Sequence, residues 1–220
     1  MADRPLAERS DWDGFWSRDN AEQYGRISWS KRRIIRLLGP LTAPDMAVMD
    51  AGCGSGFFSR YFLDQGARVT SVDYAPAALD MARAACQDRA RFLPADMLDR
   101  SFPDECGESY DLIFSDGLLE HFSPQEQDRL LNNFFRVLRP GGTIATFVPN
   151  RWSPWQLIRP FMMPGIKEKP FTGRGLTEAH VRNGLCVKQS GGVNVLPLGP
   201  SPEFLAPVFG MLVYVIAGKA

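Results

Sequence analysis

The chain has 220 residues, of which 45% are hydrophobic and 23% are charged, and its 25 basic residues balance its 25 acidic residues. That length and composition indicate one α/β domain with a small extension and exclude a disordered chain. Because the formal net charge is zero, no overall field attracts nucleic acid or an anionic membrane, although a local charged patch is still possible.

Cysteine and histidine spacing predicts no metal site. The four cysteines are far apart and form no CxxC pair, and the two histidines complete no zinc-ligand spacing. The polar N-terminus does not look like a secretion signal, and the apolar run at 207–218 is too short to span a bilayer. We therefore expect a cytoplasmic protein with reduced thiols.

Helical and strand patterns alternate along most of the chain. Helices are predicted at 31–40, 57–66, 75–87 and 123–142. Strands are predicted at 47–50, 67–73, 90–96, 110–116 and 142–150. A short helix at 177–185 and two strands near 186–196 and 209–218 are expected to follow. Apolar strands between helices are typical of a parallel sheet covered on both faces.

A glycine-rich turn separates the first strand from the helix at 57–66. Its glycines permit positive φ and let a ligand approach the backbone closely. The turn does not match the GxGxxG dinucleotide fingerprint, because Gly56 comes early and Phe57 stands at the last glycine position. Asp50 begins the motif, and a carboxylate there favours a cationic ligand without phosphate.

Two further acidic residues end the next strands. Asp73 could accept hydrogen bonds from ribose hydroxyls, or it could cap the helix that follows. Asp96 could accept from an adenine amino group while Met97 covers the ring, or it could be a surface turn residue. A nucleoside with a cationic, phosphate-free tail has the chemistry of S-adenosylmethionine.

Several segments together resemble class I, Rossmann-like S-adenosylmethionine-dependent methyltransferases, in the methyltransferase type 11 and quinone-biosynthesis-like group. They are MDAGCGSGFFS (49–59), VDYAPAALDMAR (72–83), PADM (94–97), YDLIFSDGLLEHF (110–122) and LRPGGTIATFVPN (138–150). The resemblance implies a doubly wound sheet of seven strands in the order 3-2-1-4-5-7-6, with strand 7 antiparallel. It also implies an N-terminal helical cap over 1–40 and a Rossmann-like domain over 41–220.

The same resemblance implies which residues hold the cofactor and its product, S-adenosylhomocysteine. The methionine part would lie against Asp50, Gly52, Cys53, Gly54, Gly56 and Ser115. The adenosine part would lie against Asp73, Tyr74, Asp96 and Met97. The N-terminal lid would contribute Tyr24 and Arg26 as lid and carboxylate contacts. For Cys53, a small filler of the turn is the alternative interpretation.

His121 follows the fourth strand, where ligands bind in such sheets, and could act as a general base. Its alternative is a packing or capping histidine, and His180 is expected to be solvated or capping. The irregular insert at 151–175 combines aromatic and basic residues and could be a substrate lid, a dimer contact or a membrane-touching lip. Substrate-binding candidates in this insert are Trp152, Trp155, Arg159 and Phe161.

The predicted function is direct displacement of a methyl group from S-adenosylmethionine onto a small apolar or aromatic acceptor. The acceptor atom is left open. The alternatives are a methyltransferase of protein or RNA, and a non-catalytic S-adenosylmethionine-binding scaffold. A monomer or homodimer is expected, and a nucleic-acid partner is not.

Overall fold

The computed structural model describes residues 9–17, 21–158 and 168–219. Seven strands form one sheet in the order β3-β2-β1-β4-β5-β7-β6, and β7 runs antiparallel to both of its neighbours. This order confirms the predicted fold class. The strands are β1 (Ala47–Ala51), β2 (Arg68–Asp73), β3 (Arg91–Pro94), β4 (Tyr110–Asp116), β5 (Leu138–Pro149), β6 (Cys186–Val193) and β7 (Leu212–Gly218).

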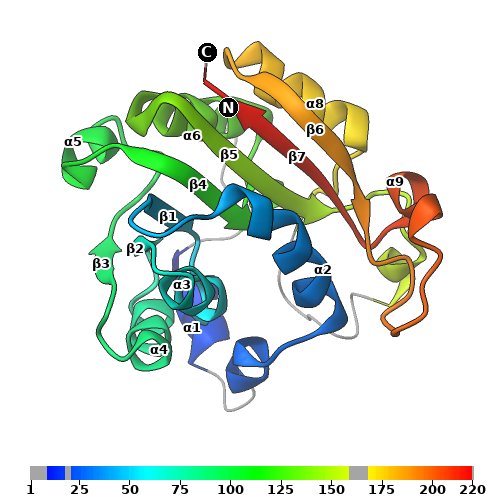
Figure 1. The fold of residues 1–220 in the computed structure, drawn as a ribbon, viewed down its shortest axis with the longest axis horizontal. Helices are drawn as coiled ribbons and strands as arrows, with labels where there is room; N and C mark the ends of the chain where they lie inside the picture. Colours follow the sequence, from blue (N-terminus) through cyan, green and yellow to red (C-terminus); the bar gives the residue numbers. More distant parts are fainter. Residues whose placement is uncertain (1–8, 18–20, 159–167, 220) are drawn as a thin grey trace.

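Helices cover both faces of the sheet (Figure 1). The α-helices are α1 (Arg9–Trp16), α2 (Trp29–Leu38), α3 (Phe57–Asp64), α4 (Pro76–Cys86), α5 (Phe102–Cys106), α6 (Pro124–Val137), α8 (Gly173–Arg182) and α9 (Ala206–Phe209). The 3-10 turns are η1 (Ala21–Gly25), η2 (Gly39–Leu41), η3 (Leu119–His121), η4 (Pro154–Leu157) and η5 (Glu203–Leu205). No helix within these described ranges is long and apolar enough to cross a membrane.

The side chains of each strand point alternately to the two faces of the sheet, so the core forms two layers, one on each face. In β4, Leu112 and Phe114 pack with Ile34 of α2 and Phe62 of α3, on one face. Ile113 points to the other face, where the helices α6 and α8 lie. Successive strand side chains point to opposite faces, so a strand buried on both sides is apolar throughout. The apolar strand centres of the sequence therefore correspond to this three-layer arrangement.

Side-chain hydrogen bonds cap the N-termini of α2 and α6. Ser123 and Glu126 form a capping box at the start of α6, with Pro124 at the first helical position. The Ser28 side chain caps α2 by accepting from the amide of Lys31. These caps satisfy amide groups that lack partners within the first turn of a helix.

Four sequence predictions were wrong in detail. The helix predicted at 123–142 ends at Val137, because Leu138 is extended and β5 begins there. The strand predicted from 209 begins at Leu212, because residues 206–209 are helical. The helix predicted at 177 begins at Gly173, where the Thr172 side chain accepts from the amide of Gly175.

The fourth wrong prediction concerns His180, which is buried rather than solvated. Its ring nitrogens lie 3.0 Å from Thr146 Oγ1 and 2.9 Å from the Leu176 carbonyl oxygen. Burial lowers its pKa to about 4, so the ring stays neutral near pH 7.

Candidate functional site

The glycine turn lies between β1 and α3, at the carboxyl edge of the sheet. Gly52, Gly54 and Gly56 all have positive φ, at 72°, 48° and 70°. Only glycine adopts this conformation routinely, so the chain can turn sharply from the strand into the helix. The backbone amide of Gly54 points to Asp73 at the end of β2, with a nitrogen–oxygen distance of 3.2 Å.

Close packing also requires glycine at these positions. A Cβ on Gly56 would lie 2.5 Å from the Cα of Ala82 in α4. A Cβ on Gly54 would lie 2.5 Å from the ring of Trp16 in α1. The turn thus brings α3 close to α4 and leaves an open backbone surface against which α1 packs.

Asp73 has the geometry expected of a ribose-binding carboxylate. Its side chain is only 6% exposed. Oδ2 accepts from the Gly54 amide at 3.2 Å, and Oδ1 accepts from the Ala75 amide at 3.0 Å. Each carboxylate oxygen has a second lone pair, so both can still accept from a hydroxyl group. Asp73 therefore stabilises its own turn without capping α4, whose N-cap is Ala75, and its ribose role stays a prediction.

The predicted adenine contacts differ in exposure. Met97 is buried, Tyr74 is half-buried and Asp96 is exposed. The Asp96 carboxylate accepts from the Leu98 amide at 2.9 Å, as in a surface turn. The structure brings the ends of β2 and β3 together, and the adenine roles of these three residues stay predictions.

Two further carboxylates lie beneath the turn. Asp50 is buried and accepts from the Ser59 hydroxyl at 2.6 Å. Burial raises the pKa of Asp50 to about 7 and that of Asp116, at the end of β4, to about 6. Asp116 was missed at the sequence level, although it ends its strand just as Asp73 does. Together these carboxylates make a site that favours a bound cation.

Cys53 and Ser115 are both buried beside this site. Burial raises the pKa of the Cys53 thiol well above its usual value, which keeps it protonated and agrees with a filler role. The Ser115 hydroxyl is buried, and no hydrogen-bond partner lies near it in the described part of the chain. It is a polar atom at the predicted methionine end of the site.

The N-terminal segment closes over the turn. The carbonyl oxygen of Tyr24 accepts from the Ser55 hydroxyl at 2.9 Å and from the Lys31 ammonium group. Asp13 of α1 accepts from the Ala77 amide at 3.0 Å, in the first turn of α4. Arg26 is exposed.

Lys31 is a half-buried cation on this side of the turn. Burial lowers its pKa to about 8, and the Asp116 carboxylate opposes that shift. Its ammonium group lies 4.1 Å from the Phe57 ring centroid. Lys31 was missed by the sequence analysis because only the folding of α2 over the turn places it there.

His121 lies in η3, next to two carboxylates. Its Nε2 is 3.6 Å from Oε1 of Glu120, and one ligand atom from each of His121, Glu120 and Glu168 lies within 4.8 Å of the others. The Trp12 ring contacts the imidazole edge-to-face, with a centroid distance of 4.6 Å. This cluster can orient the imidazole, and its donor set is also one that divalent metals use.

The predicted substrate residues are only partly placed. Trp152 is 62% exposed and Trp155 is half-buried. Arg159 and Phe161 lie outside the described residues. The substrate roles of all four stay predictions.

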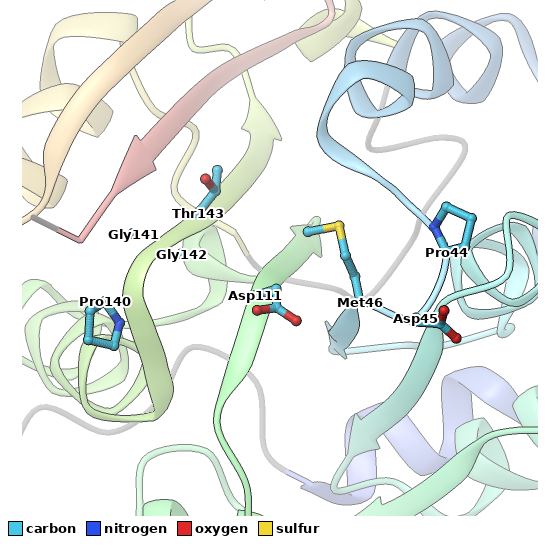
Figure 2. Close-up of a pocket in the computed structure, with 8 residues that line it drawn as sticks. All are labelled: Pro44, Asp45, Met46, Asp111, Pro140, Gly141, Gly142 and Thr143. Carbon is cyan, nitrogen blue, oxygen red and sulfur yellow. The ribbon is translucent and has the colours of Figure 1, made fainter.

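A hollow of about 460 Å³ lies at the opposite edge of the sheet (Figure 2). Its walls come from the segment at 44–46 before β1, from Asp111 of β4 and from residues 140–143 of β5. Asp111 in this hollow accepts from the Ala47 amide at 2.8 Å and from Arg139 at 2.7 Å. Ligands of open parallel sheets bind at the carboxyl ends of strands, so the glycine turn is the better candidate site.

The raised pKa values of Asp50 and Asp116 predict that cofactor affinity depends on pH. A cation bound beside Asp50 and Asp116 favours their ionised forms, so binding should expel protons. We expect cofactor affinity to rise several-fold between about pH 6 and about pH 7.5. Calorimetric titration in two buffers of different ionisation enthalpy would measure the proton release. Affinity that stays constant across this range would contradict a site of titrating carboxylates.

The ligand-free protein should show the opposite trend. The native state holds protons on these raised-pKa groups that the unfolded chain has already lost, so their contribution to stability falls as the pH rises from about 4 to about 7.

The central part of the chain is similar to known methyltransferases. Residues 49–146 match the family model described as "Methyltransferase domain". The chain is 38% identical over 110 residues to the malonyl-[acyl-carrier protein] O-methyltransferase of Serratia marcescens, which covers 50% of this chain and 41% of that relative. The chain thus spans about half the length of the curated relatives it matches.

Solved structures share the fold over nearly the whole chain. The N-methyltransferase NodS from Bradyrhizobium japonicum WM9, in complex with S-adenosyl-l-homocysteine, is 15% identical with a TM-score of 0.70, covering 96% of this chain and 97% of that one. The methyltransferase complexed with the Haloferax volcanii Trm112 activator is 21% identical with a TM-score of 0.74, covering 97% of each chain. At these identities the likeness shows the fold alone.

Proposed function

We propose that the chain carries a class I, Rossmann-like S-adenosylmethionine-dependent methyltransferase domain and that it methylates a small-molecule acceptor. The carboxylates of Asp50, Asp73 and Asp116 around the glycine turn support the proposal most strongly. They suit a ligand that is a nucleoside at one end and a cation at the other. A pyrophosphate would be repelled there.

The residues of the site fit the cofactor part by part. Asp73 would accept from the ribose hydroxyls through the lone pairs that the Gly54 and Ala75 amides leave free. Asp50 and Asp116 would face the cationic end, and Lys31 would face the carboxylate of the methionine part. When bound, the cofactor supplies a methyl group on a positively charged sulfur, which is a good leaving group.

The chain then has to align the acceptor and exclude water. In this proposal α1 covers the turn through Trp12 and Trp16, and His121 accepts the proton that a hydroxyl acceptor loses. A carboxylate acceptor would need no base. Oxygen as the acceptor atom is supported by the Serratia marcescens relative, which is named an O-methyltransferase of malonyl-[acyl-carrier protein]. That name also keeps a protein-bound acceptor as the second candidate.

Replacing His121 with alanine separates catalysis from cofactor binding. We expect turnover to fall about a hundredfold, because a positioned general base contributes at least that much. Cofactor affinity should stay within about twofold, since the imidazole is placed on the acceptor side. Turnover measured with a labelled methyl donor against pH would also lose its lower inflection. If turnover and affinity both stay unchanged, His121 is a packing residue.

The same assay tests the function and the role of the neighbouring carboxylates. Methyl transfer to a panel of phenols, carboxylic acids and acyl thioesters should identify an acceptor class. Chelator treatment should leave the rate unchanged if Glu120 and Glu168 only orient His121. Loss of activity on chelation would mean that the cluster holds a metal. Tight cofactor binding without transfer to any acceptor would favour the scaffold alternative.

A further inference from the structure

Large apolar side chains are exposed at one end of the sheet. They come from α2, from the segment at 150–158 and from the connection between β6 and β7. Figure 1 shows the course of the backbone in these parts of the chain. Phe204 is 81% exposed and Leu157 is 79% exposed, values that are unusual for side chains of this size. We call this surface the apolar rim and define it as Trp29, Trp152, Leu157, Leu198, Phe204 and Phe209.

The contributing segments are neighbours in space. The Trp29 ring lies against Gly199, where a Cβ would be 3.2 Å from it. The Asn150 side chain donates to the carbonyl oxygens of Val208 at 2.8 Å and Gly210 at 2.9 Å. These contacts join α2 and the segment at 150–158 to the same connection. The apolar rim is therefore one surface and not a set of isolated side chains.

The charges around the apolar rim are positive. The segments 26–33, 150–158 and 194–211 contain five basic residues and one acidic residue, and of the basic residues Lys31 faces the glycine turn and Arg33 is buried. That acidic residue, Glu203, is paired with Arg33 at 2.9 Å. Arg32 and Arg151 remain exposed, each stacked near an exposed tryptophan, at 5.6 Å and 5.9 Å from the ring centroid.

Exposed aromatic and apolar residues with a basic border are the composition of surfaces that insert shallowly into anionic bilayers. A second copy of the same surface would repel it, because the unpaired charges have one sign. We propose that the apolar rim docks the protein onto an anionic lipid bilayer.

The apolar rim lies at the same edge of the sheet as the glycine turn, so docking would bring the candidate site close to the bilayer. β5 ends at Pro149, β6 ends at Val193 and β7 begins at Leu212, and these residues are paired in the sheet. The rim therefore lies at the carboxyl edge, the same edge that carries the glycine turn. On the proposed function, an apolar acceptor dissolved in the bilayer would reach the methylation site without crossing water. This last step rests on the proposed function, whereas the docking itself does not.

Vesicle flotation tests the docking directly. The full chain should float with vesicles containing phosphatidylglycerol and not with vesicles of phosphatidylcholine alone, and added salt should release it. The double variant Phe204→Ser/Phe209→Ser should lower the partition coefficient by about tenfold or more, since two large apolar side chains are lost from the interface. Arg32→Glu/Arg151→Glu should weaken binding to anionic vesicles selectively.

Two variants away from the rim serve as matched controls. Val181→Ser removes an exposed apolar side chain of α8, and Arg129→Glu reverses an exposed charge of α6. Both should float like the wild type, and all variants should keep S-adenosylhomocysteine binding by calorimetry. Absence of flotation, or equal losses in the control variants, would overturn the proposal. A dimer in solution that the Phe204→Ser/Phe209→Ser variant dissociates would also overturn it and assign the rim to self-association. Failure of methyl transfer would leave the flotation result standing.

Discussion

Gly56→Ala is expected to lower the free energy of unfolding by about 3 kcal/mol or more. Gly56 has a φ of 70°, which costs a residue with a Cβ about 1–2 kcal/mol. Its new Cβ would also lie 2.5 Å from the Cα of Ala82, and backbone atoms of α4 cannot rotate away. Chemical denaturation of wild type and variant measures the difference.

Gly107→Ala is the matched control for this prediction. Gly107 has a similar φ of 64°, but nothing lies within 4 Å of the position its Cβ would take. Its cost should therefore be limited to about 1–2 kcal/mol from the backbone conformation. Equal losses for the two variants would show that α3 and α4 are not in close contact at the turn.

Asp73→Ala is expected to weaken cofactor binding by about 1–3 kcal/mol, or about 5- to 150-fold in the dissociation constant. The carboxylate would bind two ribose hydroxyls, and its loss also releases the Gly54 amide that shapes the turn. Calorimetric titration with S-adenosylhomocysteine measures the affinity. Thermal unfolding of the ligand-free variant shows how much of the loss comes from a disordered turn.

Asp96→Ala is the matched variant within the same site, and its loss of cofactor affinity is compared with that of Asp73→Ala. Asp96 is exposed and its carboxylate already accepts from the Leu98 amide, so a smaller loss of affinity is expected. Affinity that is unchanged in Asp73→Ala would exclude the ribose assignment. A loss in Asp96→Ala as large as that in Asp73→Ala would mean that the adenine contact carries comparable weight.

Sequence patterns predicted the sheet well because its determinants are local. The apolar centre of β4 and the glycine turn after β1 both lie within short segments whose periodicity and turn residues can be read directly. Strand order came from the family resemblance, and the antiparallel pairing of β7 confirms it. Boundaries failed where glycine and proline are compatible with more than one element, as at Gly173 and Pro207.

Candidate residues could be chosen from the residues themselves where they lie at the end of a strand next to the turn. Asp50 and Asp73 met that condition, and Asp116 met it but was not selected. Lys31 and Trp16 could not be found in this way, because each reaches the site through the packing of an N-terminal helix over the sheet.

The burial of His180 shows the same limit of local reasoning. Polar sequence neighbours suggested solvent exposure, whereas the helix face points the ring to Thr146 of β5.

The most direct test of the central claim is calorimetric titration of the purified protein with S-adenosylhomocysteine, with NADH as the parallel control. Micromolar binding of S-adenosylhomocysteine without binding of NADH is the predicted result. It would follow from the carboxylates at Asp50, Asp73 and Asp116, which accept a nucleoside with a cationic tail and repel a pyrophosphate. Binding of NADH in preference to S-adenosylhomocysteine, or binding of neither, would contradict the account.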